Sequence, residues 1–490
     1  MNSQTALLGP GGITFLGVYI LSLILIGWLG KRARKENSLS DFYLAGRGMG
    51  FLVLFLTLYA TQYSGNTLVG FAGRAYREGY QALVLVTLLS SAVGAFILYA
   101  PKLYRLSKKY KFITPADYIH FRFNNNKLTL FAASLCLMAL ANYILTNLKA
   151  IGYIVVSVTG GVIPFAYGVI ALSLVMVIYE TMGGMRSVAW TDSLQGIILM
   201  FGVITIFITI QIEYGGFEFI YNAIQTSDPQ KLAPPNFTQK LSWFSTVCLG
   251  FFGISIYPHA VQRIYSANNE KTLKRSIQVM AFMPIITTLF MVVVGLTAFA
   301  LFPGLDRQAS EGATLLVLKD LSQRGAIGTG MMVLFLSATI AAIMSTVDSA
   351  LLSMSSIITK DFYKRFRPKK SQAELTRIGK MISWVIMAFA VYLAIVLPQT
   401  IWRLLEIKLE LLIQVSPAIF LGLYFKKIKA KSILWGMTFG TLFAVGIMVA
   451  NKLGVDIPAK PGGLHAGVWG LIINLVIVFI LEKIKLSPDE

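Results

Sequence analysis

Hydroxyl and carboxylate side chains follow one face of a long apolar segment in the C-terminal half of the chain. Counting from Ala342, hydroxyl residues stand at i+3, i+4 and i+7, and therefore share one helical face: Ser345, Thr346 and Ser349. Asp348 lies at the margin of that face. Such groups are costly at membrane depth unless they face another helix, water or an ion, and oxygen ligands suit a hard cation such as sodium. Alternatively, each hydroxyl bonds back to its own helix, which does not account for the carboxylate.

Two apolar segments carry residues that break helices. Polar and small residues interrupt the segment 49–73 between Ala60 and Gly70, and Pro258 interrupts the segment 241–262. Discontinuous membrane helices use such points to offer backbone carbonyls to a cation and free amides to a substrate. Either interruption alone can be a packing kink. Together they are spaced as an inverted repeat of about five plus five helices would place them.

The composition is that of a polytopic membrane protein. Of the 490 residues, 56% are hydrophobic and only 13% are charged, which is more apolar surface than a soluble protein of this size can hide. The net charge is +21, and the basic residues that produce it lie between the apolar segments. They therefore indicate membrane topology and contacts to anionic lipid instead of nucleic-acid binding. No obligate protein partner is implied.

A span needs about 20 apolar residues, which predicts an all-α membrane protein with about thirteen transmembrane helices in a single transporter domain, residues 1–490. Lys and Arg concentrate in alternate loops, for example 31–35 and 360–370, so we expect the N-terminus outside and the C-terminus in the cytoplasm of a cell (plasma or inner) membrane. The predicted spans are 12–30, 49–73, 81–104, 128–157, 165–183, 192–213, 241–262, 277–302, 326–358, 378–397, 402–424, 432–451 and 466–482.

No sequence pattern of an enzyme is present. The chain lacks a phosphate-binding Walker A loop, a Gly-x-Ser-x-Gly elbow and a Cys/His metal cluster, and its three histidines are scattered. We therefore expect no catalytic residues and no organic cofactor. Any uphill transport would have to draw on an ion gradient.

Short motifs in a fixed order resemble the sodium:solute symporter family over nearly the whole chain. The resemblance implies a LeuT-type core of two inverted repeats, about 48–213 and 241–424, with peripheral helices at about 12–30, 432–451 and 466–482. It is closer to the proline and pantothenate branches than to the sugar branch. The motifs lie at 41–47, 60–70, 183–184, 190–195, 258–259, 262–263, 342–349, 360–363 and 415–417.

The resemblance implies a principal sodium site at the first helix break. Backbone carbonyls would come from Ala60, Tyr63 and Ala342, and hydroxyls from Ser345 and Thr346. This set agrees with the helical-face argument made from the residues alone.

Some members of the family hold a second sodium, which here would fall on Asp192, Ser345, Asp348 and Ser349. The chain departs from that version because Asp348 stands where a serine is found. Two facing acids strengthen cation binding, but they can also share a proton. Alternatively, Asp192 is a solvated acid near the start of its helix.

The evidence on the solute is carried by polar residues near the two breaks. The pair Pro258-His259 resembles branches that take small carboxylates, whereas Gln62 replaces the aspartate of the proline branch. Three intramembrane charges are also unusual: Lys149, Lys408 and Glu410. Lys149 is a candidate for binding a substrate carboxylate, or it instead pairs with an acid such as Glu410 or extends to the interface. The expected substrate-binding residues are Gln62, Ser64, Asn66, Thr67, Gly253, Tyr257, His259, Lys149 and Glu410.

We therefore expect a sodium-coupled secondary active symporter that imports a small organic solute by alternating access. The solute would carry a carboxylate, as an amino acid, pantothenate or a monocarboxylate does. A proton-coupled or sodium-independent carrier would keep the same fold. A membrane solute sensor is the alternative from a different class.

Overall fold

Long apolar segments make the chain helical almost throughout. The computed structural model describes residues 8–397, 408–455 and 457–483. Within these ranges the only β-type pairing is one isolated bridge between Met49 and Ala267. The helices of the N-terminal half are α1 (Pro10–Arg32), α2 (Leu39–Leu44), α3 (Phe51–Gln62), α4 (Gly65–Leu68), α5 (Gly70–Glu78), α6 (Val84–Tyr110), α7 (Pro115–Phe123), α8 (Asn126–Val158), α9 (Phe165–Gly183), α10 (Met185–Tyr214) and α11 (Gly216–Ser227).

The C-terminal half continues the same helical pattern. A π-helical turn (Leu249–Gly253) and a 3₁₀ turn (Ile254–Ile256) connect α12 to α13. Residues 408–412 form a further helical segment that leads into α22. The helices are α12 (Phe237–Cys248), α13 (Pro258–Ser266), α14 (Glu270–Met280), α15 (Phe290–Leu301), α16 (Arg307–Ser310), α17 (Ala313–Ser322), α18 (Ala326–Ile357), α19 (Lys364–Phe366), α20 (Gln372–Val396), α22 (Ser416–Tyr424), α23 (Ala430–Lys452) and α24 (Ala466–Lys483).

The protein is an all-helical, multi-pass membrane protein. Among the described residues, 10 helices are long and apolar enough to cross a membrane, or up to 11 if the bent pair Phe237–Ile256 and Pro258–Ser266 is one span. The expected count of about thirteen also included 49–73 and 402–424. In the first of these α3 is apolar but only 12 residues long. Residues 402–407 of the second lie outside the described residues.

The structure confirms both predicted helix breaks. At the end of α3, Tyr63 adopts an extended conformation (φ −105°, ψ 99°), and α4 begins two residues later. The segments on either side of Tyr257 are bent by 51°, and Tyr257 has ψ 130° because the proline that follows it disfavours helical geometry. Each break exposes backbone groups that an unbroken helix would satisfy internally.

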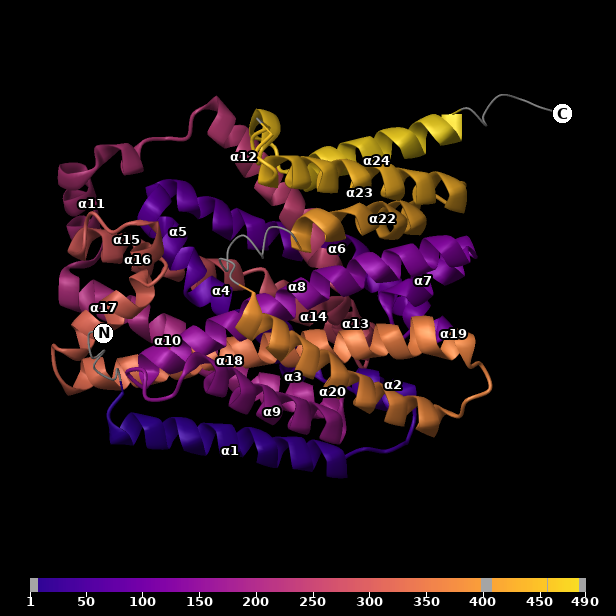
Figure 1. Ribbon diagram of the computed structural model, residues 1–490, viewed down its shortest axis with the longest axis horizontal. Helices are drawn as coiled ribbons and strands as arrows, with labels where there is room; N and C mark the ends of the chain where they lie inside the picture. The colour runs from indigo at the N-terminus through magenta and orange to yellow at the C-terminus, as the bar shows by residue number, and fades with distance from the viewer. Residues whose placement is uncertain (1–7, 398–407, 456, 484–490) are drawn as a thin grey trace.

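The helix α18 forms the centre around which the other elements pack. It has 32 residues and packs against α10, α8 and α3. In Figure 1, α1 runs along the lower edge of the molecule, and α23 and α24 lie along the upper edge. The helix α1 approaches α9 and α10 closely, since a Cβ at Gly27 or Gly30 would lie 2.4 Å from Tyr179 or Ser187.

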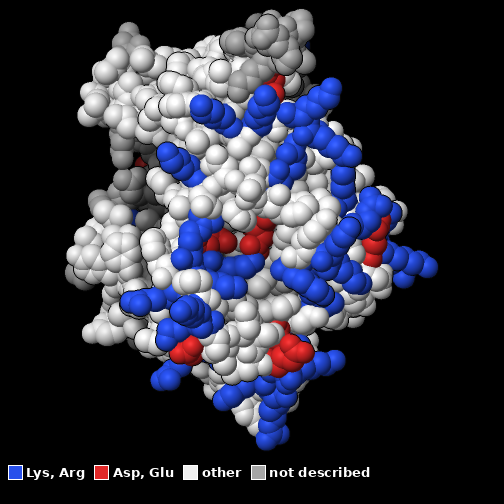
Figure 2. Space-filling view, turned by 90° about the vertical axis from the view of Figure 1, so that its right-hand side faces the viewer, with Lys and Arg blue, Asp and Glu red and all other residues white. Residues whose placement is uncertain are grey.

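One end of the molecule is strongly basic. Lys and Arg side chains crowd the face shown in Figure 2, which is the end where α1 finishes and where the turn between α19 and α20 lies. Basic residues belonging to these turns include Arg32, Arg365 and Lys370. Positive charge concentrated at one end of a helical membrane protein favours contact with anionic lipid there.

Packing of α15 against α5 predicts a stability effect. A Cβ at Gly295 would lie 2.1 Å from the carbonyl oxygen of Ala72, a backbone atom that cannot turn aside. We expect Gly295→Ala to lower the free energy of unfolding in detergent by about 1–3 kcal/mol, measured by tryptophan fluorescence on heating or in denaturant. The control is Gly94→Ala on α6, where a Cβ meets nothing within 4 Å and helix propensity favours alanine. Equal stability of G295A and wild type would contradict this packing.

Candidate functional site

The hydroxyl face of α18 meets the broken end of α3. Ser345 Oγ donates a hydrogen bond to the carbonyl oxygen of Ala60 at 2.9 Å, which joins two segments far apart in sequence. Ser345 Oγ also lies 3.1 Å from the carbonyl oxygen of Ala342, and Thr346 Oγ1 donates to that carbonyl at 2.8 Å. The hydroxyls therefore bond back to their own helix, as the alternative interpretation held, and one of them also bonds across to α3.

The break turns a further carbonyl away from the helical direction. Tyr63 has ψ 99° where a helical residue has about −42°, so its carbonyl no longer follows the axis of α3. The expected principal sodium ligands thus come from two elements that are in direct contact. Neutral carbonyl and hydroxyl oxygens form a donor set that fits a monovalent hard cation.

Asp192 on α10 is enclosed in a charged cluster. It is 0% exposed, as is Arg263 on α13, and Arg263 Nη2 donates to Asp192 Oδ2 at 2.7 Å. Thr57 on α3 also donates to Asp192 Oδ2, and Arg263 Nε donates to Thr57 Oγ1 at 2.8 Å. Arg263 further donates to Ser349 on α18. Burial excludes the alternative that Asp192 is a solvated acid at a helix start.

Asp348 lies next to this cluster but is bonded differently. Its Oδ2 accepts a hydrogen bond from Tyr179 on α9 at 2.6 Å, and its Oδ1 accepts one from Ser349 at 3.2 Å. Both donors are neutral, and the side chain is fully buried. Two carboxylates, Asp192 and Asp348, therefore share the neighbourhood of one guanidinium.

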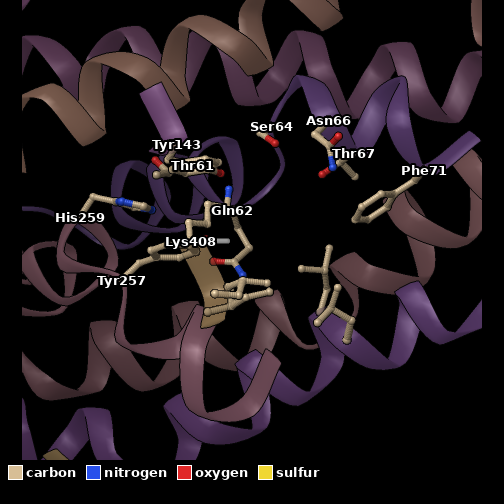
Figure 3. Close-up of a pocket in the computed structure, with 14 residues that line it drawn as sticks. Thr61, Gln62, Ser64, Asn66, Thr67, Phe71, Tyr143, Tyr257, His259 and Lys408 are labelled. Atoms are coloured by element: carbon tan, nitrogen blue, oxygen red, sulfur yellow. The ribbon is translucent and has the colours of Figure 1, made fainter. Parts of the chain in front are cut away.

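A pocket lies beside the break, bounded by α3–α6, α8, the bend before α13 and the segment 408–412 (Figure 3). Its cavity volume is about 40 Å³, far below the usual range for ligand pockets, so in this conformation it is a narrow space. It is lined by Thr61, Gln62, Ser64, Asn66, Thr67, Phe71, Leu88, Leu89, Tyr143, Ile254, Tyr257, His259, Lys408 and Leu409. Of the expected substrate-binding residues, this set contains Gln62, Ser64, Asn66, Thr67, Tyr257 and His259.

The other three expected residues do not line this pocket. A Cβ at Gly253 would lie 3.5 Å from Leu409, so that glycine packs against the segment 408–412. Lys149 stands six residues after Tyr143 on α8, which places it on another face and about 9 Å further along. Glu410 accepts a hydrogen bond from the backbone N–H of Gly467 and lies 3.3 Å from His465 Nδ1, so it ties its helical segment to the start of α24.

Aromatic rings surround a lysine that the expected set did not include. Tyr143 and Tyr257 are stacked, with ring centroids 5.3 Å apart, and His259 stacks on Tyr257 at 4.9 Å. Lys408 Nζ lies 3.2 Å from the centroid of Tyr143. The sequence signal for Lys408 is a lysine inside an apolar segment. Arg263 was also missed, although it closes the motif at 262–263.

The buried pair predicts a large loss of stability when one partner is removed. In Asp192→Asn the guanidinium of Arg263 remains buried without its counter-charge, so we expect a loss of about 3–5 kcal/mol. Chemical denaturation in detergent measures it. The control is Glu374→Gln, which breaks an exposed ion pair with Lys370 and should leave stability unchanged, since glutamine still caps the start of α20. Equal behaviour of the two variants would contradict the structural importance of the pair.

Known protein sequences resemble this chain over most of its length. The model of the Sodium:solute symporter family matches residues 42–440. An uncharacterised symporter of Bacillus subtilis (strain 168), YhjB, is 25% identical over 482 residues, which cover 96% of each chain. A sodium/proline symporter of Staphylococcus aureus (strain bovine RF122 / ET3-1) is 26% identical over 493 residues, covering 96% of this chain and 92% of the relative.

Solved structures share the fold. A Na⁺-coupled sialic acid symporter in a substrate-bound, outward-open state matches with a TM-score of 0.80 at 20% identity, covering 98% of this chain and 99% of the other. Mhp1, a transporter of the nucleobase-cation-symport-1 family, matches with a TM-score of 0.51 at 12% identity, covering 91% and 95%. At these identities the likeness shows the helical arrangement and leaves the solute open.

Proposed function

Because this chain belongs to the sodium:solute symporter family, we propose that it imports a small carboxylate-bearing organic solute by secondary active, sodium-coupled transport. Amino acids, pantothenate and monocarboxylates are the solute classes considered. The observation that carries the proposal is the bond between Ser345 on α18 and the carbonyl of Ala60 at the broken end of α3. It brings the oxygen atoms of the proposed cation site next to the pocket.

The proposed architecture has about thirteen spans in one domain, with inverted repeats over about 48–213 and 241–424. The breaks after α3 and before α13 support it, because they stand at comparable positions of the two repeats. The proposed orientation puts the basic end shown in Figure 2 in the cytoplasm of a cell membrane, as positive loops favour. The N-terminus would then lie outside.

In the proposed cycle, sodium binds first at the oxygens of Ala60, Tyr63, Ala342, Ser345 and Thr346. Sodium there would hold α3 against α18 and favour the state that accepts solute from outside. Gln62 and Ser64 flank Tyr63 in sequence and line the pocket, so the ion and the solute share one stretch of chain. Coupling of this kind is reciprocal, because each ligand raises the other's affinity by the same factor. Movement of one bundle then opens the cytoplasmic side.

Removal of the two hydroxyls tests the cation site. We expect the double variant Ser345→Ala/Thr346→Ala to raise the sodium concentration for half-maximal uptake at least about tenfold, since about 1.4 kcal/mol of binding free energy corresponds to that factor. Uptake into proteoliposomes under an inward sodium gradient, against potassium, measures it. The matched control is Ser337→Ala, a buried serine of α18 whose hydroxyl bonds only within its own helix to Val333. Unchanged sodium dependence in the double variant would refute the site.

The cluster around Asp192 supports a proposal on the sodium stoichiometry. Arg263 already supplies a positive charge to that carboxylate, so we propose one sodium per cycle and expect a sodium Hill coefficient close to one. The coefficient is measured from initial uptake rates at saturating solute. A coefficient near two would instead support a second sodium at Asp192, Ser345, Asp348 and Ser349.

The environment of Asp348 favours the proton as an alternative coupling ion. Asp348 receives hydrogen bonds only from neutral donors in the described structure, so its carboxylate can hold a proton. Accumulation that follows an inward pH gradient without sodium, and that is lost in Asp348→Asn, would establish a proton-coupled carrier. Among the described residues, no contact comparably favours a sodium-independent carrier or a solute sensor.

A further inference from the structure

The pocket contains a lysine, Lys408, that none of the described acidic residues neutralises. Lys408 is 1% exposed and lines the pocket from the segment 408–412. No carboxylate of the described residues forms an ion pair with it. Its ammonium group instead lies over the ring of Tyr143, at 3.2 Å, and 5.5 Å from the ring centroid of Tyr257. Aromatic faces compensate part of the cost of burying a cation, but a lysine at membrane depth normally pairs with an anionic group.

Unpaired polar atoms surround the same space. Gln62 Nε2, Asn66 Oδ1, Tyr257 Oη and His259 Nδ1 are buried and have no hydrogen-bond partner within the described part of the chain. Figure 3 shows Gln62, Tyr257 and His259 near Lys408, with Asn66, Thr67 and Phe71 on the other side. Buried polar atoms are normally paired, so the pocket is built to receive a ligand that carries polar groups. A lysine ammonium and a tyrosine hydroxyl together suit a carboxylate.

The pocket offers no carboxylate to a positively charged group of the solute. Its lining residues include no Asp and no Glu. Asp192 does not line the pocket: its Oδ2 lies 3.5 Å from the hydroxyl of Thr61 and already forms an ion pair with Arg263. The ammonium group of an amino acid would therefore enter a site that holds a lysine and lacks a counter-charge. This arrangement disfavours zwitterions relative to simple anions.

We propose that Lys408 binds the carboxylate of a small organic anion without an ammonium group, a monocarboxylate, and thereby selects it over amino acids. This inference rests on the proposed function and narrows its solute class. The polar side of the solute faces Gln62 and Asn66, and its carbon chain packs against Phe71, Leu88 and Leu89. One sodium and one monocarboxylate carry no net charge, so such transport is insensitive to membrane potential.

Uptake by the full-length protein in proteoliposomes tests the solute class. Labelled acetate, propionate, L-lactate and pyruvate are compared with L-proline and D-glucose, each with sodium or potassium outside. We expect saturable, sodium-dependent uptake of at least one monocarboxylate, unchanged when a potassium diffusion potential is imposed, and no uptake of L-proline. Sodium-dependent uptake of L-proline that no monocarboxylate inhibits would overturn the inference and leave sodium coupling intact. Monocarboxylate uptake that ignores sodium would support the inference and overturn the proposed function.

Substitution of the lysine assigns the role to one residue. We expect Lys408→Met to lower kcat/KM for the transported monocarboxylate by about 30-fold or more, and Lys408→Arg to recover part of it. The matched control is Lys102→Met, which also removes a lysine over a tyrosine ring, that of Tyr424, but outside the pocket. Sodium-induced thermal stabilisation should persist in Lys408→Met, which shows that the variant folds and keeps its cation site. Unchanged kcat/KM in Lys408→Met would refute the proposal.

Discussion

The contact between α18 and the broken end of α3 is the interaction on which the rest of the structure depends. A helix interrupted inside a membrane protein leaves backbone groups without internal partners, and lipid cannot supply them. Here Ser345 reaches the carbonyl of Ala60 and partly meets that need. Because carbonyl and hydroxyl oxygens are also suitable ligands for sodium, the same contact that permits the break can respond to the ion.

A second buried interaction fixes how the elements around that contact are placed. Arg263 reaches from α13 to Asp192 on α10, to Thr57 on α3 and to Ser349 on α18. A buried ion pair contributes little net stability against a hydrophobic replacement, yet it penalises any arrangement that separates its partners. The cluster therefore specifies the relative positions of four helices. Its bonds to Asp192 all go to one carboxylate oxygen, Oδ2.

Arg263 and Lys408 are both buried cations, but different groups compensate their charges. Arg263 has Asp192 at 2.7 Å, whereas Lys408 faces tyrosine rings and a pocket. Arg263, neutralised by Asp192, helps to hold helices together, whereas Lys408 has no ion-pair partner among the described residues and is the proposed partner of an anion. The proposed ion site and the pocket adjoin each other through residues 60–64. Binding at one can then bias the conformation of the other.

The sequence by itself determined the membrane class, the two helix breaks and the shared face of Ser345, Thr346 and Ser349, because apolar length, proline and helical periodicity act locally. It also selected most of the polar residues around the pocket, since they adjoin the breaks. Tertiary structure decided which intramembrane charges meet. Lys408 and Glu410 are two residues apart, and helical geometry separates their directions by about 200°. One therefore lines the pocket and the other binds α24, a difference that depends on where neighbouring helices pack.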